Sequence, residues 1–197
     1  MPIAPPGNTT RCNPDLHHRR PIRLKGYDYS QAGAYYVTIC TQSKRCVLGH
    51  VVDDAMRPSA AGRVAADCWE WLARQYPYVE MDEWIVMPNH LHGIIVIGGD
   101  EHTGPDNCKR KPLGRLVGAF KTVSTRRMRR MGLARAGRFW QRNYFEHIIR
   151  NGVELERIRN YVIENPRHWG TDRENPACRA PPPSRRPGHD EHGPTDE

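Results

Sequence analysis

Two short segments in the middle of the chain, residues 79–87 and the more apolar run 90–97, constrain the fold most tightly, because only a Pro-Asn dipeptide separates them. Both segments predict strands. The Pro-Asn dipeptide favours a tight connection between them. The pattern therefore predicts two consecutive antiparallel strands that are neighbours in one sheet.

Strand and helix patterns alternate along the rest of the chain. Residues 34–42 and 140–149 are rich in β-branched and aromatic residues and predict two further strands. Apolar residues recur at helical spacing in 59–76, 113–131 and 154–164, which predicts three helices. The order β-α-β-β-α-β-α predicts an α+β, ferredoxin-like fold: an antiparallel sheet with helices on one face, plus a C-terminal helix.

The two ends of the chain differ in composition from this central region. Residues 1–25 predict a flexible basic arm, and residues 174–197 are Pro-rich and polar and predict a disordered tail. One folded domain is expected over 26–173. We find neither a secretory signal nor an apolar run of the roughly 20 residues that a membrane span needs, so a cytoplasmic protein without membrane contact is expected.

The six cysteines contain no C-x-x-C pair. Without an export signal, this spacing indicates free thiols rather than disulfides or a zinc site.

Positive charge is concentrated in one stretch of a chain whose formal net charge is +8. Residues 109–142 contain 12 Lys or Arg and no Asp or Glu. A basic composition alone does not separate nucleic acid from anionic membrane, but a run without acidic partners favours phosphate contact. The candidate DNA-binding residues are Arg20, Arg23, Lys25, Arg115, Lys121, Arg126, Arg127 and Arg130.

His90 and His92 stand at the start of the apolar run 90–97. Residues i and i+2 of a strand point to the same face, so the two imidazoles are expected side by side, where they could share a divalent metal. The alternative is two core histidines that are each satisfied by a hydrogen bond. Polar rings in an apolar strand need a partner, and the H-x-H spacing alone leaves both interpretations open.

Three sequence blocks resemble, in the same order, those of REP-associated tyrosine transposases, a domesticated bacterial branch of the single-tyrosine HUH transposases. The blocks are WIVMPNHLHG (84–93), FWQRNYFEHIIRN (139–151) and YVIENP (161–166). The resemblance covers about residues 22–170. It implies an HUH nuclease fold and a metal-dependent single-stranded DNA endonuclease and strand transferase that acts through a 5′-phosphotyrosine.

Spacing alone leaves Tyr144 and Tyr161 as the leading candidates for the nucleophile. Tyr161 and Asn165 share one helical face, so a hydroxyl and an amide oxygen could approach the same centre. The resemblance implies that Tyr161 is the nucleophile and that Asn165 joins His90 and His92 around Mg²⁺ or Mn²⁺. Asn165 is also suited to cap the helix.

The resemblance also suggests roles for Glu146 and His147, which match a recurrent Glu-His pair of the family. They are expected to support the metal ligands or contact DNA, and a structural role is equally open. The implied partner is single-stranded or hairpin DNA of palindromic repeats. The resemblance allows either a monomer or a homodimer.

Two other functions fit the same fold. Ferredoxin-like sheets also form non-catalytic nucleic-acid binding modules, although the glycine and aromatic signature of an RRM is not found. A metal-dependent phosphodiesterase is the second alternative. Phosphoesterases that use H-x-[ST] motifs are excluded, because no histidine of the chain has Ser or Thr two positions later.

Overall fold

A four-stranded antiparallel sheet forms the centre of the computed structural model, which describes residues 24, 26–99 and 110–179. The strand order is β4-β5-β1-β6. The strands are β1 (Gly33–Cys40), β4 (Val79–Val86), β5 (His90–Ile97) and β6 (Phe145–Ile149).

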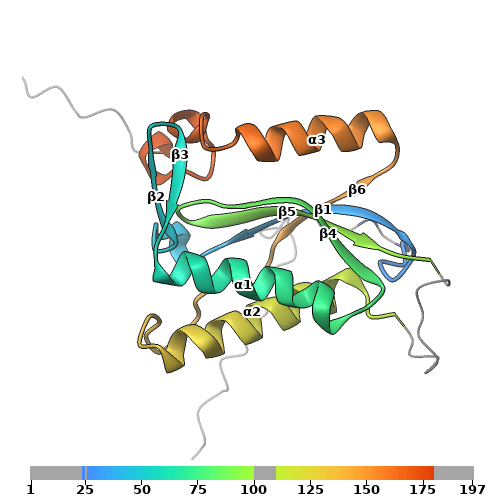
Figure 1. Ribbon diagram of the computed structural model, residues 1–197, viewed down its shortest axis with the longest axis horizontal. Coiled ribbons are helices and arrows are strands. Elements are labelled where there is room, and N and C mark those ends of the chain that lie inside the picture. The colour runs from blue at the N-terminus through green and yellow to red at the C-terminus, as the bar shows by residue number, and fades with distance from the viewer. Residues whose placement is uncertain (1–23, 25, 100–109, 180–197) are drawn as a thin grey trace, which may run out of the picture.

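Helices cover both faces of this sheet (Figure 1). The helices α1 (Ala60–Gln75) and α2 (Leu113–Arg130) lie side by side on one face, and α3 (Gly152–Glu164) lies on the other. The predicted ferredoxin-like arrangement with an added C-terminal helix is confirmed. The arm that contains Arg20, Arg23 and Lys25 lies outside the described residues, as does the chain from residue 180 onward.

The face under α1 and α2 holds the main hydrophobic core. Trp69 of α1 and Phe120 of α2 are fully buried and meet edge to face, with 5.4 Å between ring centroids. This packing requires glycine at position 93 of β5, because a Cβ there would lie 2.5 Å from Cζ2 of Trp69. The lack of a side chain at Gly93 therefore leaves room for the Trp69 indole on the face of the sheet opposite the histidine pair.

A small hairpin between β1 and α1 was not predicted. It consists of β2 (Gly49–Val52) and β3 (Ala55–Pro58), joined by Asp53 and Asp54. Both aspartates have positive φ, 50° and 56°, as a two-residue type I′ turn requires. Asp-Asp is not the Asn-Gly or Asp-Gly signal that usually marks such a turn, and each strand has only four residues.

The last predicted strand is shorter than expected. It begins at Phe145 rather than near residue 140, and Trp140 makes only an isolated bridge with Thr41. The indole N–H of Trp140 instead donates to Ser124 Oγ of α2 at 2.9 Å. This aromatic residue therefore packs in the core.

Both ends of α3 are capped by asparagine. Asn151 accepts a hydrogen bond from the Glu154 backbone at its N-terminus, and Asn165 is the C-cap residue. The described chain continues through the short helices η4 (Trp169–Thr171) and η5 (Pro176–Arg179). The predicted boundary between domain and tail, at residue 174, falls inside this continuous segment.

The remaining expectations concern cysteines and membranes. Cys40, Cys46 and Cys68 are free thiols. No helix in the described part of the chain is both long enough and apolar enough to cross a membrane.

Candidate functional site

The histidine pair lies at the beginning of β5, on the face of the sheet that α3 covers. The ring centroids of His90 and His92 are 4.3 Å apart, and both residues are buried. Their antiparallel neighbours on β1 are Cys40 and Thr38. Strand alternation thus brings the two imidazoles together as predicted.

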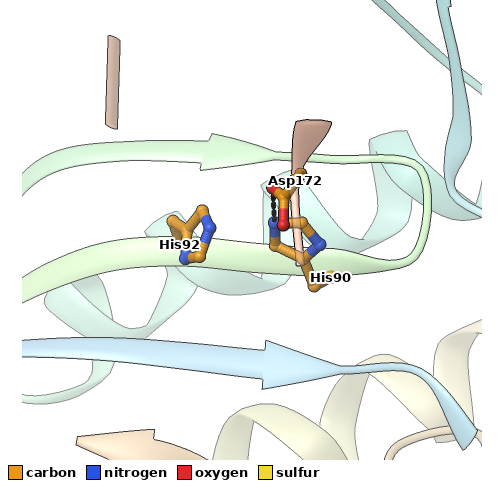
Figure 2. A group of neighbouring side chains, drawn as sticks. All are labelled: His90, His92 and Asp172. Carbon is orange, nitrogen blue, oxygen red and sulfur yellow. Dashed lines mark ion pairs between the residues drawn. The ribbon is translucent and has the colours of Figure 1, made fainter. Parts of the chain in front are cut away.

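Asp172 completes a group of three side chains that could hold a metal ion (Figure 2). One possible ligand atom from each of His90, His92 and Asp172 lies within 4.8 Å of the others. His90 Nε2 and Asp172 Oδ2 are 3.8 Å apart, which is too long for a hydrogen bond. This separation leaves both atoms available to a cation.

Asp172 was missed because no motif marks it. It directly follows η4, in the segment after α3, and its carboxylate lies beside the His90 ring (Figure 2). Asn165, the predicted third ligand, is also buried, and its side chain lies next to that of Asp172. The structure therefore brings both residues to the histidine pair.

Asn89 determines which nitrogen of His90 carries the proton. The Asn89 side-chain amide donates to the carbonyl oxygens of Lys44 at 3.1 Å and Glu174 at 2.7 Å. Its Oδ1 must then be the acceptor at 2.8 Å from His90 Nδ1. Nδ1 therefore bears the hydrogen, and Nε2 presents a lone pair toward Asp172.

Burial keeps both imidazoles neutral. It lowers the pKa of His90 well below its usual value and lowers the pKa of His92 to about 3. For His90, the neighbouring His92 acts in the same direction. Burial also raises the pKa of Asp172, against a hydrogen bond from the Glu174 backbone. Neutral imidazoles are the form that binds metal ions.

Four buried atoms around this centre have no hydrogen-bond partner among the described residues. They are Nε2 of His90, Nε2 of His92, Oδ2 of Asp172 and Oδ1 of Asn165. Buried polar atoms are normally satisfied, and each unsatisfied one costs about 1–3 kcal/mol. Three of these atoms belong to side chains whose possible ligand atoms lie within 4.8 Å of one another, and such nitrogen and oxygen atoms suit a divalent cation.

Two contacts of Glu174 attach the segment that carries Asp172 to the end of β1 and the turn after it. Glu174 pairs with Lys44 and accepts a hydrogen bond from Cys40 Sγ at 3.1 Å. Lys44 belongs to a turn after β1 in which it and Ser43 have positive φ, 53° and 57°. Non-glycine residues seldom adopt this conformation, and such strain concentrates at functional sites.

Tyr161 projects from α3 toward the same centre. Its ring centroid lies 5.4 Å from that of His92, and the residue is 48% exposed. Burial raises the pKa of Tyr161 and Asp172 acts in the same direction, whereas hydrogen bonds with Asn165 and Tyr36 lower it. The helix packs on the sheet of its own chain, which places Tyr161 beside the histidines of that chain.

A cleft of about 630 Å³ opens over these residues. Tyr144, the alternative nucleophile, also lines it, next to the ammonium group of Lys121, which lies 5.3 Å from the ring centroid. The lining residues are Tyr36, Thr38, Cys40, Lys44, His92, Gln141, Asn143, Tyr144, Phe145, Tyr161, Asn165, His168, Thr171, Asp172, Arg173 and Glu174.

Glu146 and His147 lie outside this cleft. Alternation along β6 points Glu146 to the face under α1 and α2, where it is buried. His147 faces α3, but its Nε2 contacts Glu154 Oε1 at 2.7 Å, in the first turn of that helix. The structure thus gives His147 a contact that attaches α3 to β6, and it brings neither residue to the metal ligands.

A basic groove of about 570 Å³ continues from the cleft. It lies between the C-terminal half of α2 and residues 137–142, and Gln141 lines both hollows. Of the predicted DNA-binding residues, Lys121, Arg126 and Arg130 line the groove; its other arginines are Arg129, Arg138 and Arg142.

The other predicted basic residues lie elsewhere. Arg115 lines a separate hollow with Tyr27 and Tyr29, beside the start of α2. Arg127 contacts Cys68 of α1. Lys121 is mostly buried, and its ammonium donates to the carbonyls of Gln141 at 2.9 Å and Asn143 at 3.1 Å. Lys121 thereby holds the turn between the groove and the cleft, and burial lowers its pKa to about 8.

The chain is similar to one protein in sequence and to a solved structure in fold. No model of a protein family matches the chain. A protein of Haemophilus influenzae strain Rd, described as uncharacterized, is 37% identical over 177 residues, which are 83% of this chain and 97% of the relative. The structure of a REP-associated tyrosine transposase bound to a REP hairpin superposes with a TM-score of 0.54 at 17% identity, covering 75% of this chain and 74% of that one. The latter likeness shows a shared fold, as the sequence blocks predicted.

Proposed function

This chain belongs to one family with the Haemophilus influenzae protein and has the fold of a REP-associated tyrosine transposase, and we propose that it cleaves and rejoins single-stranded DNA. The observation that carries the proposal is the position of Tyr161, 5.4 Å from His92 between ring centroids, next to a group of side chains that could hold a metal ion. Such a tyrosine stands where a nucleophile and a bound phosphate could meet.

The residues present fit a divalent cation. His90, His92 and Asp172 offer two imidazole nitrogens and a carboxylate oxygen, and Asn165 offers an amide oxygen. This mixed set of nitrogen and oxygen ligands suits Mn²⁺ or Mg²⁺. When bound, such an ion would polarise a phosphate and make its phosphorus easier to attack.

Tyr161 would carry the covalent step. Its hydroxyl oxygen loses its proton to solvent and attacks the phosphorus, the bond from phosphorus to the 3′ oxygen breaks, and the 3′ oxygen takes up a proton from solvent. The products are a 5′-phosphotyrosine and a free 3′-OH. The new bond is a phosphodiester like the old one, so attack by a 3′-OH rejoins a strand without ATP.

The basic groove is the proposed path of the DNA backbone toward this tyrosine. Arg126, Arg129 and Arg130 on α2 face Arg138 and Arg142 across it, and the groove meets the cleft at Gln141. Phosphate contacts of this kind position a strand without reading its sequence. Because the structural relative is bound to a REP hairpin, we propose a hairpin of palindromic DNA as the substrate.

The test is covalent capture of an oligonucleotide. The full chain is incubated with Mn²⁺ and a labelled hairpin that carries single-stranded flanks, and adducts are resolved on a denaturing gel. Wild type is expected to form an adduct and Tyr161→Phe to form none. Tyr144→Phe is the matched control, since it removes the other tyrosine hydroxyl in the cleft, and it should keep the adduct.

Each other outcome contradicts part of the proposal. An adduct at full level in Tyr161→Phe moves the nucleophile, and its loss in Tyr144→Phe alone moves it to that residue. Salt-sensitive hairpin binding without any adduct indicates a non-catalytic binding module. Release of a phosphate monoester without an adduct indicates a metal-dependent phosphodiesterase.

A further inference from the structure

Tyr36 lies beside both His92 and Tyr161, with 5.6 Å and 6.2 Å between the ring centroids. It lies on β1, two residues before Thr38, so both side chains point to the face that α3 covers. Thr38 is the direct antiparallel neighbour of His92. Tyr36 itself is buried at the centre of the small apolar cluster beneath α3.

Two hydroxyl groups converge on a single nitrogen of His92. The Tyr36 hydroxyl lies 2.7 Å from His92 Nδ1, and Thr38 Oγ1 lies 2.9 Å from the same atom. Thr38 Oγ1 also donates to the Tyr36 hydroxyl at 3.3 Å. The rings of Tyr36 and His92 are stacked, with 27° between their planes. These contacts leave His92 little freedom to rotate.

Metal binding requires one tautomer of His92. An ion held by Nε2 needs the lone pair of that nitrogen, so the ring hydrogen must then be on Nδ1. With the hydrogen on Nδ1, that nitrogen donates to the hydroxyl oxygens, and Nε2 presents a lone pair. Asn89 imposes the same arrangement on His90, so both Nε2 atoms are acceptors.

The Tyr36 side chain also contacts Tyr161. The rings of Tyr36 and Tyr161 meet nearly at right angles, 84°, with centroids 6.2 Å apart. This ring contact places the Tyr36 side chain directly against that of Tyr161.

From these contacts we infer that Tyr36 is a positioning residue that, with Thr38, holds His92 with Nε2 toward the metal and seats Tyr161 beside it. Partners of this kind, outside the ligands themselves, orient histidines in metal sites. The inference rests on the proposed metal centre, and it does not require strand transfer.

The first experiment measures Mn²⁺ binding to the full chain without DNA, by calorimetry. Tyr36→Phe keeps the ring and removes the hydroxyl, and we expect about tenfold weaker binding, with a larger loss in Tyr36→Phe/Thr38→Val. Tyr35→Phe is the matched control. Tyr35 is equally buried, but its hydroxyl donates to Gln31 O on the other side of the sheet, and Mn²⁺ binding should stay within about twofold. Circular dichroism checks the fold of each variant.

The second experiment reads the tautomer in metal-free protein. Long-range ¹⁵N–¹H NMR spectra of wild type should show His92 with a protonated Nδ1, and His90 likewise. In the double variant, which has neither hydroxyl, the His92 signals should shift toward the other tautomer, while those of His90 stay unchanged because Asn89 remains.

Failure of this inference is separable from failure of the proposed function. Unchanged Mn²⁺ affinity in the double variant, an equal loss in Tyr35→Phe, or a protonated Nε2 on wild-type His92 overturns the role of Tyr36. Wild type that binds Mn²⁺ but forms no DNA adduct contradicts strand transfer and leaves the role of Tyr36 supported. Wild type that binds no Mn²⁺ contradicts both.

Discussion

The two faces of the sheet differ in what covers them. On one face, α1 and α2 enclose a continuous apolar core that includes the fully buried Trp69 and Phe120. On the other, α3 rests on a small apolar cluster, and the adjoining area holds polar groups. The members of that cluster are Tyr36, Ile94, Ile158 and Val162.

This difference places most of the apolar core on one face and the proposed site on the other. Apolar burial is the main favourable contribution to folding, whereas buried polar groups without partners oppose it. The α3 face gathers four such atoms around the histidine pair and attaches its helix partly by charge, through Arg159 and Asp82. A large core on the opposite face allows this arrangement to persist.

The largest expected effect is on stability, and it compares one phenylalanine on each face of the sheet. Phe120→Ala removes a fully buried ring under α2, and the free energy of unfolding should fall by about 3–5 kcal/mol, as measured by urea denaturation. Phe145→Ala is the control on the α3 face. Because Phe145 is 50% exposed, its loss should be below about 1 kcal/mol. Equal losses would contradict the proposed division between the two faces.

Acid should destabilise the α3 face selectively. Burial holds the pKa of His90 and His92 below the unfolded value of about 6.5, so the unfolded chain binds protons that the folded chain does not. Their contribution is complete above pH ~6.5 and is lost as pH falls toward the folded values. The slope is at most about 1.4 kcal/mol per pH unit for each histidine.

This pH dependence is measured by urea denaturation in metal-free buffer from pH 7 to 5. His92→Gln should flatten the profile by removing one of the two buried histidines. His50→Gln, at an exposed position of β2, should leave the slope unchanged. A wild-type profile as flat as that of His92→Gln would show that the pair does not remain neutral in the fold.

The smallest expected effect concerns the attachment of α3. Arg159 donates from Nε to Asp82 Oδ1 at 2.8 Å and from Nη2 to Asp82 Oδ2 at 2.6 Å. Asp82→Asn should cost about 1 kcal/mol or less in global stability while speeding hydrogen exchange in α3 more than in α2. Glu70→Gln, which breaks an exposed pair with Arg74 on α1, is the control and should not change α3.

The same ion pair has its own pH dependence. The hydrogen bond from Arg159 lowers the pKa of Asp82 below the unfolded value of about 3.9. The contribution of the pair is therefore present above that value and is lost as pH falls through the folded pKa. Exchange in α3 that is equally fast in wild type and Asp82→Asn at pH 7 would show that the pair does not hold this helix.

Local periodicity in the sequence was enough for the main elements and for two parts of the site. A period of two along β5 puts His90 and His92 on one face, and the spacing of four along α3 puts Tyr161 and Asn165 on another. Each of these relations lies within a single element, so it follows from backbone geometry. The same reasoning missed β2 and β3, because short strands around an Asp-Asp turn carry little periodic signal.

Tertiary structure alone decided which residues complete the site. Asp172 reaches His90 across 82 positions of sequence, and Tyr36 reaches His92 across 56. Neither contact leaves a local pattern, because it depends on strand register and on the path of the chain after α3. The pairing of the sheet also places Glu146 on the face opposite the histidines, which fits the structural role that the sequence left open. Periodicity assigns each side chain to a face of its own element, whereas only the packing of elements determines which faces meet.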